Sequence, residues 1–529
     1  MTRTRRIAGG AAFGIANQLV AVVVGLWLTP FVLHHLGQHD YGLWLLGLQV
    51  AGYLTIADIG VVAILPRQTA FAAGAARSGG GNAELGDLAG NTMRLVLWQV
   101  PLVAAISLGA WLLLPAAWAP LRGPLAVVLA GYVAAFPLRV FPALLQGLQD
   151  LAFLGKVQFA GWLLSTGLVI VLLATGRGLY AMAVGWSVTQ LLSPLLSWRR
   201  LATHHAGVLP RQLPRLSLVD ARRYLARSTW VSVGQIASGL VEGSDVMVVG
   251  ALLGPAAVVP YALTGKLVTV VGWLPNLLAH TSGPALSEMR VSEPPDVLRR
   301  ATGALTQAVL VASGLIGCVI LAVNAGFVTW WVGAERFGGL TLTVLFVVLM
   351  LSRHYTTTVV YTIYSFGHER RLALIGLAQG VASVAASLAL VRTLGVAGAV
   401  LGALFANVAL TLPLALPVVA RDTGTSPGRL LRGLVPWGWR LTLLLAAGTL
   451  AGVWLLPRGL LGVAAVGLLA TALYAALAWP FVLRPPLREY ALQIWRSTAA
   501  RLGMDRLQGR DARLGERVPL PGERTGDEP

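Results

Sequence analysis

The amino-acid sequence predicts an all-α, polytopic membrane protein of about fourteen transmembrane helices. Of its 529 residues, 56% are hydrophobic and 12% are charged, far from the composition of soluble domains. The mean hydropathy is +0.73. Apolar runs of about 17–25 residues, the length that crosses a bilayer as a helix, recur along the chain. Since an open strand in lipid leaves its backbone groups unsatisfied, we expect each run to be α-helical.

The predicted spans alternate with short basic gaps. They are residues 10–32, 43–65, 92–114, 124–146, 157–174, 180–197, 229–253, 259–281, 303–324, 340–363, 372–391, 396–419, 440–456 and 460–483. A long basic link between Trp198 and Arg227 separates six spans from eight, and a second follows the twelfth. We therefore predict a six-helix lobe with an inner linker (1–225), a second six-helix lobe (226–425), helices 13 and 14 (426–485) and a cytoplasmic basic tail (486–529).

The charge pattern indicates topology. A net charge of +19 could suggest nucleic acid, but the basic residues lie in gaps between apolar runs rather than on one domain, so we expect no nucleic-acid partner. With the N-terminus inside, few arginines face outside, which predicts both termini in the cytoplasm of a bacterial inner membrane. The basic N-terminus lacks an A-x-A cleavage pattern, which predicts an uncleaved first helix. A single cysteine, Cys318, excludes a disulfide framework.

We expect the first outer turn in LTPFVLHHLGQHDYGLW, between Leu28 and Trp44. Pro30 and the pair Gly37 and Gly42 would end one helix and begin the next. The stretch also contains histidines, a residue type that binds metals, but no cysteine or acidic residue shares their spacing. We interpret these as solvated loop residues: His34, His35 and His39.

Motifs of covalent chemistry are not found. The sequence PYALTGK, from Pro260 to Lys266, lacks the first glycine and the final Ser or Thr of a phosphate-binding loop. No G-x-S-x-G, C-x-x-C or H-E-x-x-H motif is present, nor are paired carboxylates on an outer loop. We therefore expect no enzyme, no cofactor and no metal site.

Ionisable residues inside the spans are the candidate functional groups, because each costs about 2.5–3.5 kcal/mol to insert. Asp245 and Lys266 are predicted about 12 and 10 Å from the outer ends of consecutive antiparallel helices, which could bring them together. Glu242 shares the face of Asp245. Such a group would compete for one proton or cation. The full set is Asp58, Arg139, Glu242, Asp245, Lys266 and Arg353, with His354 beside it.

A structural alternative stays open for these residues. They could be neutralised pairs that hold the bundle together, especially Asp58 and Arg139, which are predicted at a common depth nearer the cytoplasm. Arg353 could be a cavity cation or a packing residue. Prolines inside the spans permit bends, and spaced glycines permit close helix packing. Bent helices with polar groups at mid-depth favour a transporter over a receptor or an enzyme.

The order of several motifs resembles the polysaccharide flippases of the multidrug/oligosaccharidyl-lipid/polysaccharide exporter superfamily. The resemblance is carried by Asn17 and Gln18, the stretch TPFVLHHLGQHDYGLW, LTIADIGV (Leu54 to Val61) and GSDVMVVGALLGPAAVVPYALTGKL (Gly243 to Leu267). It implies two six-helix lobes around a central cavity, plus two extra helices. It also implies carriage of an undecaprenyl-pyrophosphate-linked oligosaccharide from the inner to the outer leaflet.

The resemblance suggests a role for each buried charge. Asp58, Asp245 and Lys266 match acidic and basic positions of the family pattern. Substrate-binding cations would be Lys266, Arg353 and Arg139, and ion-coupling acids would be Asp245, Glu242 and Asp58. The expected partners are the lipid-linked oligosaccharide, membrane lipids, and a proton or sodium ion. The alternatives are a cation-coupled multidrug extrusion pump of the same superfamily, or a membrane-embedded polymerase or glycosyltransferase acting on lipid-linked sugars.

Overall fold

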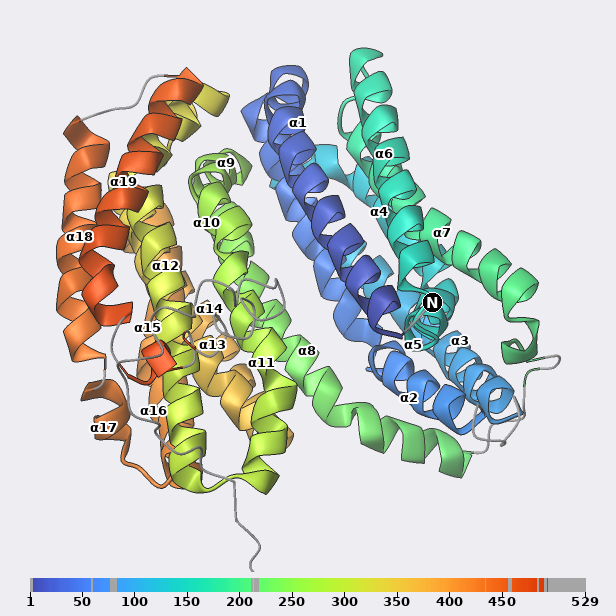
Figure 1. The fold of residues 1–529 in the computed structure, drawn as a ribbon. Coiled ribbons are helices and arrows are strands. Elements are labelled where there is room, and N and C mark those ends of the chain that lie inside the picture. The colour runs from blue at the N-terminus through green and yellow to red at the C-terminus, as the bar shows by residue number, and fades with distance from the viewer. Residues whose placement is uncertain are drawn as a thin grey trace, which may run out of the picture.

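The protein is described by a computed structural model that covers residues 3–58, 60–76, 83–210, 213, 218–432, 434–454, 459–482, 485–489 and 492. Within these residues all regular structure is helical and no strand is present (Figure 1). Of the predicted tail, residues 486–489 and Leu492 are described, and the rest lies outside the described residues. The side chains of Asn17 and Gln18 also lie outside the described part.

The helices form two groups, seen on the right and left of Figure 1. The first group consists of α1 (Arg3–Tyr53), α2 (Val61–Ala75), α3 (Ala83–Leu112), α4 (Arg122–Ala135), α5 (Val140–Gly147), α6 (Leu151–Ala174) and α7 (Leu179–His204). The second group begins with α8 (Leu218–Leu253), α9 (Pro255–Thr264), α10 (Lys266–Val271), α11 (Trp273–Ser292), α12 (Pro295–Val332), α13 (Leu340–Ser365), α14 (Glu369–Leu394), α15 (Val396–Ala406) and α16 (Leu412–Asp422). It ends with α17 (Pro427–Arg432), α18 (Val435–Trp454) and α19 (Gly459–Val482).

The all-α membrane architecture is confirmed. Among the described residues, 11 helices are long and apolar enough to cross a membrane, or 12 if one bent pair is a single span. This is fewer than the predicted count for two reasons. One candidate, Val20–Ile56, joins the first two predicted spans across Gly37, and α18 is not among the candidates although it is a helix of 20 residues.

The first outer turn is tighter than predicted. Helical backbone continues on both sides of Gly37, whose φ of 74° and ψ of 173° make the break. Pro30 lies inside the helix rather than at its end. The neighbouring histidines use local partners, since His35 Nδ1 lies 2.9 Å from the Phe31 carbonyl oxygen and His39 Nδ1 lies 3.2 Å from Asp40 Oδ1. One glycine in the left-handed region therefore replaces the predicted loop.

The eighth predicted span is broken. Where the sequence predicted one helix over 259–281, α9, α10 and α11 follow one another with interruptions at Gly265 and Gly272, and the axis bends by 51° at the first break. The Gly265 N–H donates to the Tyr261 carbonyl at 3.2 Å, a last helical bond before the bend. The bend places Lys266 at the start of α10.

The two groups meet along α1, which packs against α8 and α9. Where α1 meets α9, both labelled in the upper part of Figure 1, Gln38 Nε2 donates to the Ala256 carbonyl at 3.0 Å. A Cβ on Gly42 would overlap the carbonyl oxygen of Pro255, so the backbones of α1 and α9 are as close as glycine permits. Trp331 Nε1 donates to the Leu26 carbonyl at 2.6 Å and ties α12 to the same end.

The last two helices cover α12. Tyr474 Oη on α19 donates to the Val311 carbonyl at 2.8 Å. On α18, a Cβ at Gly452 would overlap the Leu321 carbonyl oxygen of α12, whereas a Cβ at Gly438 would meet nothing within 4 Å. The close packing of α18 on α12 therefore depends on a small residue at position 452.

Substitution of these two glycines should give opposite results. Gly452→Ala must push α18 off the α12 backbone, and such overpacking costs about 1–3 kcal/mol. Gly438→Ala, the matched control on the same helix, should gain up to about 1 kcal/mol because alanine is the better helix former. Thermal unfolding in detergent measures both changes. Equal midpoints for the two variants would contradict the described packing of α18.

Candidate functional site

A cavity of about 1310 Å³ lies between the two helix groups. The first group contributes α1 and α2, and the second contributes α8 to α11, α13, α14 and the wide turn η7 (Asn407–Thr411). Six Asp, Glu, Lys and Arg side chains line the cavity: Arg67, Glu242, Asp245, Lys266, Arg353 and Glu369. The cavity therefore holds three cationic and three anionic groups between apolar helices.

The cavity is closed where α1 meets α9 and accessible towards the other end. Near the closed end Tyr261 is buried, and Tyr41 and Lys266 are half-buried. Further along, Arg67 on α2 and Glu369 at the start of α14 are exposed. Ionisable side chains at this depth are tolerated where they line a water-filled space.

Asp245 is held by a tyrosine rather than by a cation. Tyr261 Oη on α9 donates to Asp245 Oδ2 at 2.5 Å, and Asp245 Oδ1 accepts from the Val246 N–H at 2.9 Å. Tyr261 is itself 2% exposed and packs on Phe346, with ring centroids 5.1 Å apart. The carboxylate therefore sits in a fixed position on the cavity wall.

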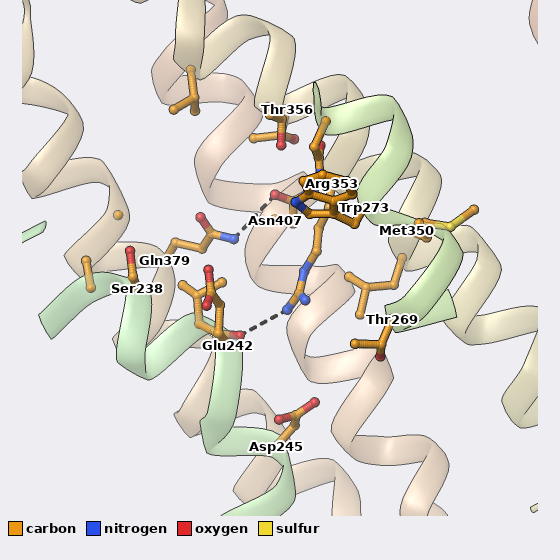
Figure 2. A pocket seen from close by; sticks show the side chains of 18 of the residues that line it. Ser238, Glu242, Asp245, Thr269, Trp273, Met350, Arg353, Thr356, Gln379 and Asn407 are labelled. Atoms are coloured by element: carbon orange, nitrogen blue, oxygen red, sulfur yellow. Dashed lines mark hydrogen bonds between the residues drawn. The ribbon is translucent and has the colours of Figure 1, made fainter. Parts of the chain in front are cut away.

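Arg353 reaches across the cavity to α8. Its Nη2 donates to the Val241 carbonyl at 3.0 Å, and its Nε finds no hydrogen-bond partner within the described part of the protein. Figure 2 shows the guanidinium approaching α8 with Glu242 and Asp245 on either side. A guanidinium has five N–H donors. The Nε–H of Arg353 is buried, so the N–H groups of its two terminal nitrogens that Val241 does not use are the ones left for a ligand.

The structure brings four of the predicted site residues to one cavity but does not pair them. Glu242, Asp245, Lys266 and Arg353 all line it. Among the described residues, none of the four makes an ion pair within 4.0 Å, so Asp245 and Lys266 share a cavity without forming a salt bridge. Asp245 instead accepts a hydrogen bond from Tyr261, and Lys266 lies beyond the bend that separates α9 from α10.

The other two predicted residues lie elsewhere. Asp58 is 1% exposed and accepts from the Val62 N–H at 3.3 Å. Arg139 donates to Tyr132 Oη at 3.0 Å, and Tyr132 Oη donates to the Leu54 carbonyl at 3.0 Å. Neither Asp58 nor Arg139 is among the residues that line the cavity, so ion coupling by Asp58 and substrate binding by Arg139 stay predictions. The contacts of Arg139 and Tyr132 join α4, η4 (Phe136–Arg139) and η1 (Leu54–Asp58). Contacts of this kind would be expected if these residues help to hold the helix bundle together.

Two lining residues, Gln379 and Asn407, were not singled out from the sequence. Gln379 Nε2 on α14 donates to Asn407 Oδ1 at 3.3 Å, and Asn407 Nδ2 donates to Ser352 Oγ on α13 at 2.7 Å. His354, which follows Arg353, lies with Nδ1 2.7 Å from Ser313 Oγ on α12. The signal available in the sequence was an uncharged amide inside each of two apolar spans, at Gln379 and Asn407.

Metal ligation has no basis in the described side chains, since no group of three or more His, Cys, Asp or Glu residues there is placed to hold a metal ion. The cavity instead offers a guanidinium, an ammonium, carboxylates and amides. These groups can bind a polar or charged headgroup without covalent chemistry.

Comparison with known proteins identifies the fold. No protein-family model matches the sequence, and no curated protein matches it. Among solved structures, the lipid II flippase MurJ in an inward closed conformation aligns with a TM-score of 0.62 at 11% identity, over 90% of this chain and 100% of that chain. An inward-facing multidrug resistance MATE family transporter of the MOP superfamily aligns with a TM-score of 0.53 at 15% identity, over 74% and 96%. The chain therefore has the fold of these transporters.

Closure at the α1–α9 contact should depend on Gly42. In Gly42→Ala the new methyl group overlaps the Pro255 carbonyl, and the cost of about 1–3 kcal/mol favours separated helices by roughly 5–150-fold. We expect the distance between spin labels at His39 and Ala256, both exposed, to lengthen in this variant, measured in a Cys318→Ala background.

The control for that measurement is Gly52→Ala on the same helix, where a Cβ meets nothing within 4 Å. It should leave the distance distribution between the labels unchanged. The same short distance in Gly42→Ala as in the parent would mean that this contact does not close the cavity.

Proposed function

We propose that the chain is a transporter that moves an undecaprenyl-pyrophosphate-linked oligosaccharide from the inner to the outer leaflet of a bacterial inner membrane, for cell-surface polysaccharide biosynthesis. Both termini would be cytoplasmic, as the arginine distribution predicts. The fold shared with solved transporters supports a transport function. The choice of substrate is supported by the cavity itself.

The observation that carries the proposal is a pair of cations without a salt-bridge partner in an intramembrane cavity. Neither Arg353 nor Lys266 forms an ion pair within 4.0 Å among the described residues. A pyrophosphate cannot enter hydrocarbon alone, because a desolvated charge needs a counter-charge or water. These two side chains can provide the counter-charge while the lipid tail stays in the bilayer.

The size of the cavity also fits a large headgroup. Pockets for drug-sized ligands occupy about 300–1,000 Å³, and the cavity here is about 1310 Å³. The excess volume favours a phosphate with attached sugars over a single small molecule.

Transport would proceed by alternating access. The contact of Gly42 with Pro255 closes one end, and the bend of 51° before Lys266 shows that the second group already contains a broken helix next to that contact. Rocking of the two helix groups about this region would close the accessible end and open the other. The headgroup bound in the cavity would then be presented to the opposite leaflet.

Glu242 and Asp245 are proposed as the ion-coupling acids. Both face the cavity that contains Arg353, and Figure 2 shows them on the same stretch of α8. A proton or sodium ion on this pair would change the net charge of the cavity from one transport state to the next. The bond from Tyr261 to Asp245 links that change to α9, the helix that makes the closing contact.

A second candidate function is extrusion of organic cations. The observation that favours it is the set of three acidic residues on the same cavity wall: Glu242, Asp245 and Glu369. Carboxylates in a low-dielectric site would attract a lipophilic cation.

Neutralising the cavity cations should stop lipid flipping. Arg353→Gln and Lys266→Gln each remove a charge-assisted interaction worth about 1.5–3 kcal/mol, so we expect flipping to slow roughly 10–100-fold. The assay follows a fluorescent undecaprenyl-pyrophosphate oligosaccharide in proteoliposomes. Arg371→Gln, an exposed residue of α14 outside the cavity lining, is the matched control and should flip at the parent rate.

The same vesicles distinguish the two candidates. Transport of ethidium by the parent protein without lipid flipping would establish the multidrug function and contradict the flippase. Unchanged flipping in both Arg353→Gln and Lys266→Gln would remove the proposed headgroup site.

A further inference from the structure

The cavity wall contains an uncharged polar cluster beside Arg353, which we name the amide cluster: Ser352, Gln379, Asn407 and Thr411. Gln379, Asn407 and Thr411 line the cavity, and Ser352 anchors Asn407 from α13. Figure 2 shows Gln379 bonded to Asn407, with Asn407 drawn next to Arg353.

The cluster is built on an irregular turn that the sequence specifies. Residues Asn407–Thr411 form a π-helical turn between α15 and α16. Pro413 has no N–H to donate to the carbonyl of Ala409, four residues earlier, and its ring crowds that carbonyl, so a regular α-turn is disfavoured here. Wide turns of this kind occur mostly as single turns inside helices and are frequent at functional sites.

The bonds inside the cluster fix its geometry and leave specific groups free. Asn407 is 1% exposed and uses both ends of its amide, one with Ser352 and one with Gln379. Thr411 is 1% exposed, and its hydroxyl is buried without a hydrogen-bond partner among the described residues. The side-chain oxygen of Gln379 also accepts no hydrogen bond there. The cluster therefore contains an acceptor and a buried hydroxyl whose hydrogen-bonding capacity is unused.

The chemistry of these groups indicates their ligand. Amides and hydroxyls both donate and accept, which matches sugar hydroxyl and acetamido groups. A phosphate only accepts, and an organic cation would leave the buried groups unsatisfied, which is unfavourable. Exposed aromatic rings on the same cavity, Trp273 and Tyr364, offer apolar faces for the C–H face of a sugar ring.

We propose that the amide cluster is a sugar subsite that binds the uncharged sugar next to the pyrophosphate. The adjacency of Ser352 and Arg353 on α13 puts the sugar ligands beside the phosphate ligand. This inference extends the proposed function, because both describe the same lipid-linked headgroup. It predicts selectivity for lipids that carry a sugar over the bare lipid pyrophosphate, since a site built to bind hydroxyls discriminates against ligands that lack them.

The test compares two ligands on the purified full chain: undecaprenyl pyrophosphate, and the same lipid bearing an N-acetylhexosamine-containing disaccharide. The parent protein should bind the sugar-bearing lipid at least about tenfold more tightly. Gln379→Leu and Thr411→Val should each reduce this ratio by roughly threefold to tenfold, with unchanged affinity for the bare lipid. Thr411→Val keeps the shape of the side chain and removes a hydroxyl with no protein partner, so folding should be retained.

Thr442→Val is the matched control, since Thr442 is exposed on α18 and bonds only to the Gly438 carbonyl of its own helix within the described structure. A selectivity ratio unchanged in both Gln379→Leu and Thr411→Val would overturn the sugar subsite. Binding of both lipids with equal affinity, weakened by Arg353→Gln, would overturn the subsite but leave the proposed function standing. Binding of neither lipid by the parent protein would refute the proposed function itself.

Discussion

The desolvation of charged side chains is the constraint on which this structure depends. Arg353, Lys266, Asp245 and Glu242 lie on helices that cross apolar surroundings, and among the described residues no ion pair neutralises any of them. Such groups are stable only next to water or polar partners. The cavity between the helix groups supplies both. The hydrogen bond from Tyr261 holds Asp245 in place, and the hydrogen bond to the Val241 carbonyl holds Arg353. The same polar space is what an anionic headgroup would need.

Small residues and helix breaks shape that space. Gly42 allows the backbone of α1 to reach α9 and close one end, while the breaks at Gly265 and Gly272 turn the chain so that Lys266 faces the cavity. Elsewhere in the cavity lining, the wide turn that contains Asn407 is followed by Pro413, which has no backbone N–H. In each case a local feature of the backbone determines where a polar side chain lies. The cavity thus combines a charged part for phosphate with an uncharged part for sugar.

Hydropathy predicted the fold well, because bilayer thickness fixes the length of a span and the bilayer requires helices. The cost of burying charge singled out Arg353, Lys266, Asp245 and Glu242, and all four line the cavity. Their partners could not be predicted, since the depth of a residue along a helix does not define the helix's rotation or its neighbours. Asp245 thus bonds to Tyr261 instead of Lys266, and Arg139 faces Tyr132 instead of the cavity. Gln379 and Asn407 were missed because neutral amides stand out less than charges in an apolar span.

The most direct measurement of a hydrated cavity is the reactivity of single cysteines towards a membrane-impermeant thiol reagent present on both sides of the bilayer. In a Cys318→Ala background, Thr269→Cys probes the cavity wall, and Leu468→Cys probes α19, where Leu468 is 71% exposed and outside the cavity lining. A water-filled cavity predicts that the cysteine at position 269 reacts and the cysteine at position 468 does not. An unreactive cysteine at position 269, with the protein folded, would contradict the account.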